Sequence, residues 1–168
     1  LELESLSNNS RDMHNVIGVS SGSSNFIDAN DDLEPFSDLT DLNLSFISNQ
    51  NIRLSDDIRS NIEPYHIWNT SIKTEGQASL LSITPEIKSG ISAYFYNPYT
   101  QEIKPLTSLV NTIQISQSGN YLIIAGSSDI LNKEIQSIIA SIYPADFKIH
   151  TNYPNPFNPT TTLKYDLN

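Results

Sequence analysis

Short runs in which apolar and polar residues alternate constrain the fold of this chain more than any other feature. Within residues 65–73, Trp68, Thr70 and Ile72 fall on one face of an extended strand. Similar short runs occur at 42–46, 78–83, 91–96, 111–115 and 120–125. Glu-Gly, Thr-Pro, Asn-Pro and Ser-Gly pairs lie between these runs and favour turns. Many short strands with regular turns predict a mainly β fold, an antiparallel sandwich or barrel.

One segment departs from this alternation and predicts a helix over 129–143. Its apolar residues recur at helical spacing, and Ser128 or Asp129 is available as the N-cap. The residues on the apolar face are Leu131, Ile135, Ile138, Ile139 and Ile142. We expect this short amphipathic helix to close the domain against its sheet.

The 168 residues predict one domain of ordinary size followed by a tail. Residues 1–14 are expected to form an N-terminal strand or the remnant of a preceding domain. Residues 15–40 are rich in Ser, Asn and Asp and predict a polar linker or loop. The sandwich with its closing helix is then expected over 41–147, and a Pro-rich linker with a further strand over 148–168.

The tail is the most unusual part of the chain. Three prolines fix φ, remove backbone donors and push the preceding residues out of the helical region, so the segment is expected to be extended or turned. The motif consists of Asn152, Tyr153, Pro154, Asn155, Pro156, Phe157, Asn158, Pro159, Thr160 and Thr161. Beyond it, Leu163, Tyr165 and Leu167 alternate with polar residues, which predicts a strand.

This motif resembles the start of the C-terminal sorting domain carried by cargo of the bacterial type IX secretion system. The resemblance implies a secreted or cell-surface protein, and the type IX secretion machinery as the partner that reads the tail. It also implies that the chain carries only the first strand of a truncated sorting domain. The plain alternative is a stiff Pro-rich spacer without an addressing role.

A second resemblance covers most of the remaining chain. The order of its matching segments is similar to the Ig-like β-sandwich module that often precedes this sorting domain in secreted bacterial surface proteins. It rests on residues 15–18, residues 28–35, Asp57, Arg59, Trp68, residues 93–105 and residues 120–126. The resemblance implies an antiparallel Ig-like sandwich next to an upstream domain of the same polypeptide. It does not imply a particular activity. The pattern of Asp57 and Arg59 before Trp68 favours a structural clasp, because Arg holds a carboxylate or carbonyl with a fixed fork.

Composition excludes several classes of function. The formal net charge of −10 disfavours nucleic acid and anionic membranes as partners. Cysteine is absent, so the chain has no disulfide and no zinc-thiolate site. No apolar run approaches the roughly 18 residues of a membrane span.

The best candidate for a metal site is the acidic stretch at 28–34. Asp28, Asn30 and Asp32 stand at the first, third and fifth positions of an EF-hand-like loop, and calcium prefers such oxygen ligands. Leu33 then replaces the turn glycine, and Leu39 stands where the bidentate Glu should be. We favour a solvated acidic loop without a cofactor and keep a structural calcium ion as the alternative.

Three tyrosines are the candidate ligand-binding residues. Tyr94, Tyr96 and Tyr99 lie close together in the chain and could stack on sugar rings or on a partner surface. The interpretation that we favour is that Tyr94 and Tyr96 are ordinary strand residues on one sheet face. Binding of a glycan or a surface protein is therefore the alternative function.

The candidate catalytic motifs lack the flanking structure or the residue spacing that their chemistry requires. Gly18, Ser20 and Gly22 fit G-x-S-x-G, but no apolar strand and helix flank them as a nucleophile elbow requires. The three histidines, at 14, 66 and 150, have no metal-ligand spacing and read as surface or edge-strand residues. The sequence therefore predicts a non-catalytic, exported β-sandwich module that spaces or presents an upstream domain.

Overall fold

The computed structural model describes residues 1–8, 10–35, 42–143, 148–149, 162 and 165–166. The chain divides into two compact units, Leu1–Leu131 and Asn132–Asn168. The first unit holds two sheets, and the second holds most of the helix and a short strand pair. Within the described residues, no helix has the length and apolar character needed to cross a membrane.

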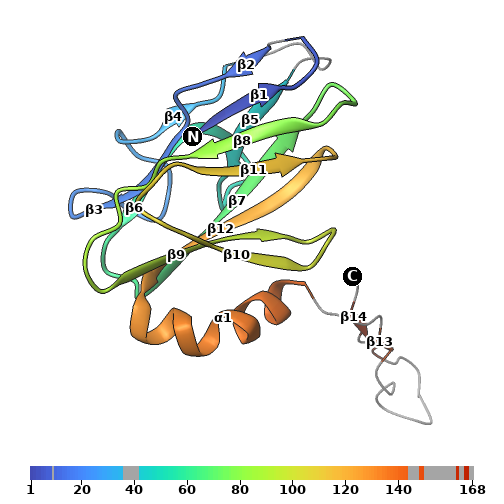
Figure 1. Ribbon diagram of the computed structural model, residues 1–168. Coiled ribbons are helices and arrows are strands. Elements are labelled where there is room, and N and C mark those ends of the chain that lie inside the picture. The colour runs from blue at the N-terminus through green and yellow to red at the C-terminus, as the bar shows by residue number, and fades with distance from the viewer. Residues whose placement is uncertain (9, 36–41, 144–147, 150–161, 163–164, 167–168) are drawn as a thin grey trace. The chain divides into compact units, whose positions relative to one another are not determined.

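The larger sheet has eight strands, seven of them in the order β10-β9-β12-β7-β5-β6-β3, with β4 also paired to β6 (Figure 1). All of its pairings are antiparallel except that of β3 with β6. Its strands are β3 (Val16–Ser20), β4 (Asp32–Leu33), β5 (Asn43–Ile47), β6 (Arg53–Ser60), β7 (Tyr65–Lys73), β9 (Ile91–Asn97), β10 (Glu102–Leu106) and β12 (Gly119–Ser127).

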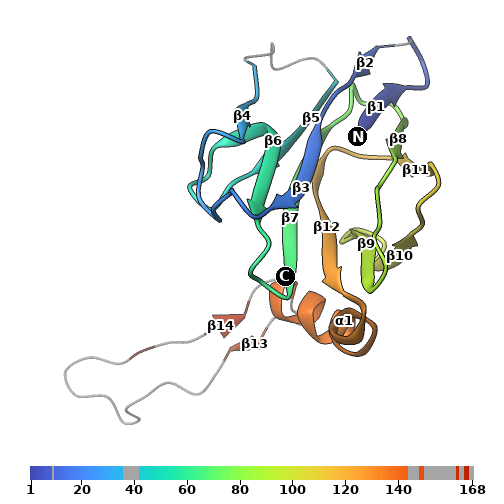
Figure 2. The ribbon, with the colours of Figure 1, turned by 90° about the vertical axis from the view of Figure 1, so that its left-hand side faces the viewer.

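The smaller sheet has four antiparallel strands in the order β11-β8-β1-β2. They are β1 (Glu2–Ser5), β2 (Arg11–Asp12), β8 (Ser79–Ile83) and β11 (Asn111–Ile115). Figure 2 shows this sheet facing β7 and β12 of the larger one. The predicted mainly β fold, an antiparallel-rich sandwich with a single helix near the C-terminus, is confirmed.

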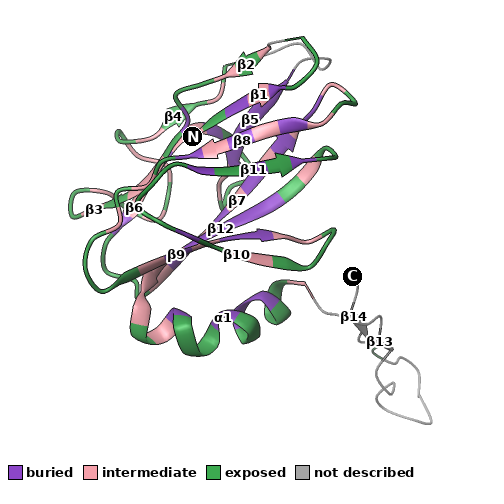
Figure 3. Ribbon diagram, viewed as in Figure 1, coloured by how far each residue is buried: buried purple, intermediate pink, exposed green. Residues whose placement is uncertain are grey.

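The core lies between the two sheets because each strand directs alternate residues inward. In β7, every second residue from His66 to Ile72 is buried, and in β8, Ser79, Leu81 and Ile83 are buried (Figure 3). Alternation within the runs at 42–46 and 65–73 predicts four apolar residues on the inner face, and each is at most 2% exposed: Leu44, Phe46, Trp68 and Ile72.

The helix α1 (Ser128–Ile142) confirms the helical pattern to within one residue at each end. Leu131, Ile135, Ile138 and Ile139 are buried, whereas Ile142 is 37% exposed at the last turn. At the start of the helix, the amide of Ser128 donates to the carbonyl of Gly90 at 2.9 Å. In the second unit, β13 (Lys148–Ile149) pairs with β14 (Tyr165–Asp166) in antiparallel fashion.

The predicted boundaries of the sandwich need correction at the N-terminal side. The sandwich begins with β1 rather than near residue 41, because β1 lies between β8 and β2 in the smaller sheet. The segment 15–40, which we expected to be a polar linker or loop, also contains β3 and β4. Both are edge strands against β6. The sequence of β3, Val-Ile-Gly-Val-Ser, is a short β-branched run inside a polar stretch, and β4 is too short, at two residues, to show a pattern.

Replacement of Leu3 by Ala tests whether the N-terminal strand belongs to the core. Leu3 is 0% exposed, so the substitution is expected to lower the free energy of unfolding by about 2–5 kcal/mol. The same substitution at Leu6, which is 57% exposed, should change it by less than about 0.5 kcal/mol. Urea denaturation measures both values, and equal small effects would contradict the placement of β1.

Candidate functional site

The most highly organised polar site lies where β6 and β7 extend beyond their shared neighbour β5. The pairing of β5 with β7 ends at Ile47 and Asn69, and β5 pairs with only the first two residues of β6. No ladder of backbone hydrogen bonds joins β6 to β7 in the described part of the chain. Side chains join the two strands instead, and we call Asp57, Arg59, Ser60, His66 and Trp68 the β6–β7 seam.

An ion pair forms the centre of the seam. Arg59 donates through Nε and Nη2 to the two carboxylate oxygens of Asp57, at 2.9 and 2.8 Å. Its Nη1 donates to the carbonyl of Ile67 on β7 at 2.8 Å. The two side chains are only 12% and 6% exposed, so this bidentate pair is largely removed from water. One arginine therefore holds a carboxylate on its own strand and the backbone of the next.

Trp68 makes a second bridge between the strands. Its indole Nε1 donates to the carbonyl of Asp57 at 3.2 Å, and the ring is 2% exposed. The guanidinium carbon of Arg59 lies 5.2 Å from the centroid of the Trp68 ring. At this distance the positive charge is attracted to the aromatic face, which stabilises the buried cation. The structural clasp that the sequence predicts from these three residues is therefore present.

His66 makes a third bridge, which the sequence analysis missed. Its Nε2 donates to the carbonyl of Ser60 at 2.7 Å, and the residue is 7% exposed rather than on the surface. Burial lowers the pKa of His66, and the nearby charge of Arg59 lowers it further, while the hydrogen bond to Ser60 acts in the opposite direction. The alternation within residues 65–73 could have indicated this burial, because His66 lies two residues before Trp68 and therefore on the same face of the strand.

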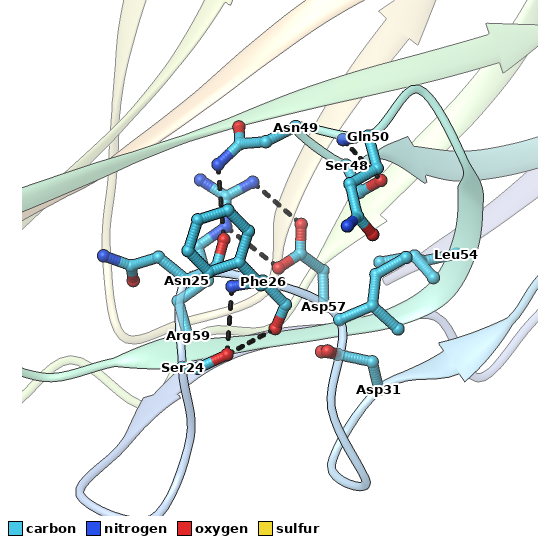
Figure 4. Close-up of a pocket in the computed structure, with 11 residues that line it drawn as sticks. Ser24, Asn25, Phe26, Asp31, Ser48, Asn49, Gln50, Leu54, Asp57 and Arg59 are labelled. Carbon is cyan, nitrogen blue, oxygen red and sulfur yellow. Dashed lines mark hydrogen bonds and ion pairs between the residues drawn. The ribbon is translucent and has the colours of Figure 1, made fainter.

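Two loops cover the seam and leave almost no space beside it. Asn25 accepts a hydrogen bond from the amide of Ser60 at 3.3 Å, and Asn49 donates to the carbonyl of Asn25 at 3.2 Å. Figure 4 shows Asn25, Phe26 and Asn49 around the ion pair. The cavity here measures about 10 Å³, room for about one water molecule. The arrangement is suited to joining strands rather than to holding a substrate.

The larger hollow of the first unit is an open, polar groove. It measures about 490 Å³. Asn43 donates to the carboxylate of Glu34 at 2.7 Å on its wall, and burial raises the pKa of Glu34. Asp12 accepts hydrogen bonds from the amide of Leu44 at 2.6 Å and from Asn15 at 2.8 Å. The residues that line the groove are Ser10, Arg11, Asp12, Met13, Glu34, Pro35, Leu42, Asn43 and Glu75.

The three candidate tyrosines do not form one exposed aromatic surface. Tyr96 is 5% exposed, and Tyr99 is 50% exposed. The Tyr99 ring contacts the edge of Tyr121 at a centroid distance of 5.5 Å, and Tyr121 stacks on Phe95. Because neighbouring strand residues point to opposite faces, this places Tyr99 on the face opposite to Tyr96.

The acidic stretch at 28–34 uses its carboxylates to shape the loop. Asp28 accepts from the amides of Ser24 and Asn30 at 2.6 and 2.8 Å, and these hydrogen bonds lower its pKa. Asp31 accepts from the amide of Ile58 at 2.7 Å, which ties the loop to β6. Asp32 lies in β4. Among the described residues, no group of three His, Asp or Glu side chains is arranged to hold a metal ion.

The remaining candidates fall in different places. Ser20 ends β3, where its hydroxyl accepts from the amide of Gly22 at 3.3 Å, and a strand rather than a nucleophile elbow precedes it. His14 lies on the surface with a φ of 72°. The sorting motif at 152–161 lies outside the described residues.

Comparison of the chain with known protein families gives no match, and neither do comparisons with curated proteins and with solved structures.

Replacement of Arg59 by Lys tests the seam. Lysine cannot form the fork, so we expect the free energy of unfolding to fall by about 1.5–3 kcal/mol. Arg11 offers a matched control, because it also contacts a carboxylate, that of Glu4 at 2.8 Å, but its side chain is 55% exposed. Arg11 to Lys should cost less than about 0.5 kcal/mol in the same urea titration. Equal costs would contradict the special role of Arg59.

Replacement of His66 by Gln tests the pH dependence of the seam. The lowered pKa means that the unfolded chain binds a proton more readily, so stability falls as the pH drops below the unfolded value of 6.5. Gln retains a donor for Ser60 but cannot be protonated. The loss of stability between about pH 7 and pH 5 should therefore be smaller in this variant.

The matched control for this measurement is His14 to Asn, which removes an exposed histidine and suits the positive φ. Glu34 and Asp56 have raised pKa values, mainly because of burial, and their contributions oppose that of His66. These contributions are common to all variants and cancel in the comparison. Identical pH profiles for wild type and the His66 variant would exclude the predicted effect.

Proposed function

We propose that this chain is a non-catalytic β-sandwich module of an exported bacterial protein, at the cell surface or released from it. In this role it spaces or presents an upstream domain of the same polypeptide. The tail from Asn152 carries the start of a type IX secretion sorting signal. The observation that carries the proposal is the motif at 152–161, in which three prolines and two aromatic residues stand at close spacing.

The chemistry of the first unit supports a scaffold role. Several ionisable side chains form hydrogen bonds that hold strands and loops together. Asp57, Arg59 and His66 bridge β6 and β7, and Asp28 and Asp31 shape the loop that precedes β4. A spacer needs this kind of rigidity, because it must keep its neighbours apart without changing shape.

The alternative of glycan binding through the tyrosines has less support. A stacking platform needs exposed rings on one surface, and Tyr96 and Tyr99 differ in both exposure and face. Burial raises the pKa of Tyr121 to about 12, and Tyr99 beside it contributes, so the Tyr99–Tyr121 contact belongs partly to the core. These rings are therefore better suited to packing than to capturing a sugar.

Intact-mass analysis of the native protein from its source tests the proposal. Samples come separately from cytoplasm, cell surface and culture medium. We expect a surface or medium form whose chain ends between about residues 147 and 153 because the signal is removed after export. An uncleaved form confined to the cytoplasm would contradict the proposal. Replacing Pro156 and Phe157 together by Ala should retain the protein inside the cell, whereas Leu109 to Ala, at an exposed position of the sandwich, should leave export unchanged.

A further inference from the structure

The margins of the two sheets differ in how they are protected from pairing with another strand. An edge strand presents unpaired N–H and C=O groups, and proteins usually block such edges with charge, proline or a covering side chain. Five strands form the margins: β10, β3 and β4 in the larger sheet, and β11 and β2 in the smaller one.

Four of these margins carry a blocking feature. Strand β10 contains Lys104 and Pro105. The Nζ of Lys104 also donates to the carbonyl of Thr112 at 2.9 Å and so covers part of the edge of β11. Strand β2 has only two residues, Arg11 and Asp12, and both are charged. Strand β4 also has only two residues, one of which is Asp32. Pairing with a further strand is therefore discouraged at each of these margins.

The margin at β3 carries no such feature. Its sequence from Val16 to Ser20 has neither charge nor proline, and on the side away from β6 no strand of the described residues pairs with it. Val16 is 45% exposed and Val19 is 54% exposed. Strand β3 lies at the left in Figure 1 and faces the viewer in Figure 2. This edge is thus a suitable template for strand addition.

The charges beside β3 indicate the chemistry of its partner. Asp56 lies opposite Val16 across the β3–β6 pairing and opposite Asp32 across the β4–β6 pairing. Asp31 lies close by, since its carboxylate accepts from the amide of Ile58 in the same part of β6. The Leu1 ammonium lies near Asp56, but Glu2 and Asp12 also lie near that ammonium, so acidic groups outnumber it. Arg59 is already paired with Asp57. The edge therefore lies in a negative field, which attracts cations and repels a second copy of this chain.

We propose that the outer edge of β3 is a docking site for an extended segment of another protein, in which apolar β-branched residues are flanked by lysine or arginine. The backbone of the segment pairs with β3, and its β-branched side chains lie beside Val16 or Val19 on the two faces. The flanking cations lie on the side of Asp56, the acidic residue of β6 that is opposite Val16. Main-chain pairing supplies the affinity, and charge selects the partner.

A peptide titration followed by NMR of the isotope-labelled full chain tests this proposal. The probe is a short synthetic peptide of alternating Val and Thr residues with lysines at both ends. We expect it to shift amide signals mainly within Val16–Ser20, and to bind more weakly as salt is added. The same peptide with terminal glutamates should bind at least about tenfold more weakly because of like-charge repulsion.

Val19 to Lys places a cation on the edge and is expected to weaken binding of the lysine-flanked peptide at least about tenfold. Leu109 to Lys makes the same kind of change at a position that is 76% exposed and not in a strand, and should leave binding unchanged. Val16 to Lys repeats the test on the other face of β3. Melting temperatures verify that each variant folds, which the exposure of these side chains leads us to expect.

Several outcomes would overturn the proposal. One is the absence of shifts within Val16–Ser20, and another is equal binding by Val19 to Lys and the wild type. Equal binding of the glutamate-flanked peptide would show that charge does not select the partner. Concentration-dependent shifts at the same amides without peptide would identify a second copy of the chain as the occupant instead.

Discussion

The bidentate pair of Asp57 and Arg59 is the interaction on which the arrangement around β6 depends. Two charges lose most of their hydration here, at 6% and 12% side-chain exposure, and that loss is expensive. Fork geometry, the bond to the Ile67 carbonyl and the face of Trp68 offset it. Removing either partner would leave the other charge buried without a counter-charge, so loss of either residue would destabilise the fold.

Arg59 of this pair also helps to join β6 to β7, which are not joined by backbone pairing in the described part of the chain. Beyond the end of β5, β6 and β7 run on to the turn that joins them without a ladder between them in the described structure. The backbone carbonyls of Asp57, Ser60 and Ile67 each accept a hydrogen bond from a side chain of the other strand. Specific side chains thus join β6 to β7, and the loops at 24–27 and 48–50 line the small cavity beside them.

Much of the sandwich could be predicted from alternation alone. Residues 65–73 form β7 as expected, and the inward side chains Phe46, Trp68 and Ile72 are buried because they share the parity of their strands. The helical spacing of Leu131, Ile135 and Ile138 likewise predicted α1, since a period of 3.6 is incompatible with a strand. β6 was not predicted, because its sequence Arg-Leu-Ser-Asp-Asp-Ile-Arg-Ser looks polar although Asp57 and Ser60 are buried.

The sequence by itself determined the mainly β class, the central strands, the helix and the association of Asp57 and Arg59 with Trp68. These features follow from local periodicity and from side chains that seek particular partners. Only the tertiary structure decided that β1 belongs to the smaller sheet, that β3 is a parallel edge and that His66 is buried at the seam. The physical reason is that contacts between residues far apart in the sequence decide which strands are neighbours and which lie at an edge. The local sequence of a short segment does not specify these contacts.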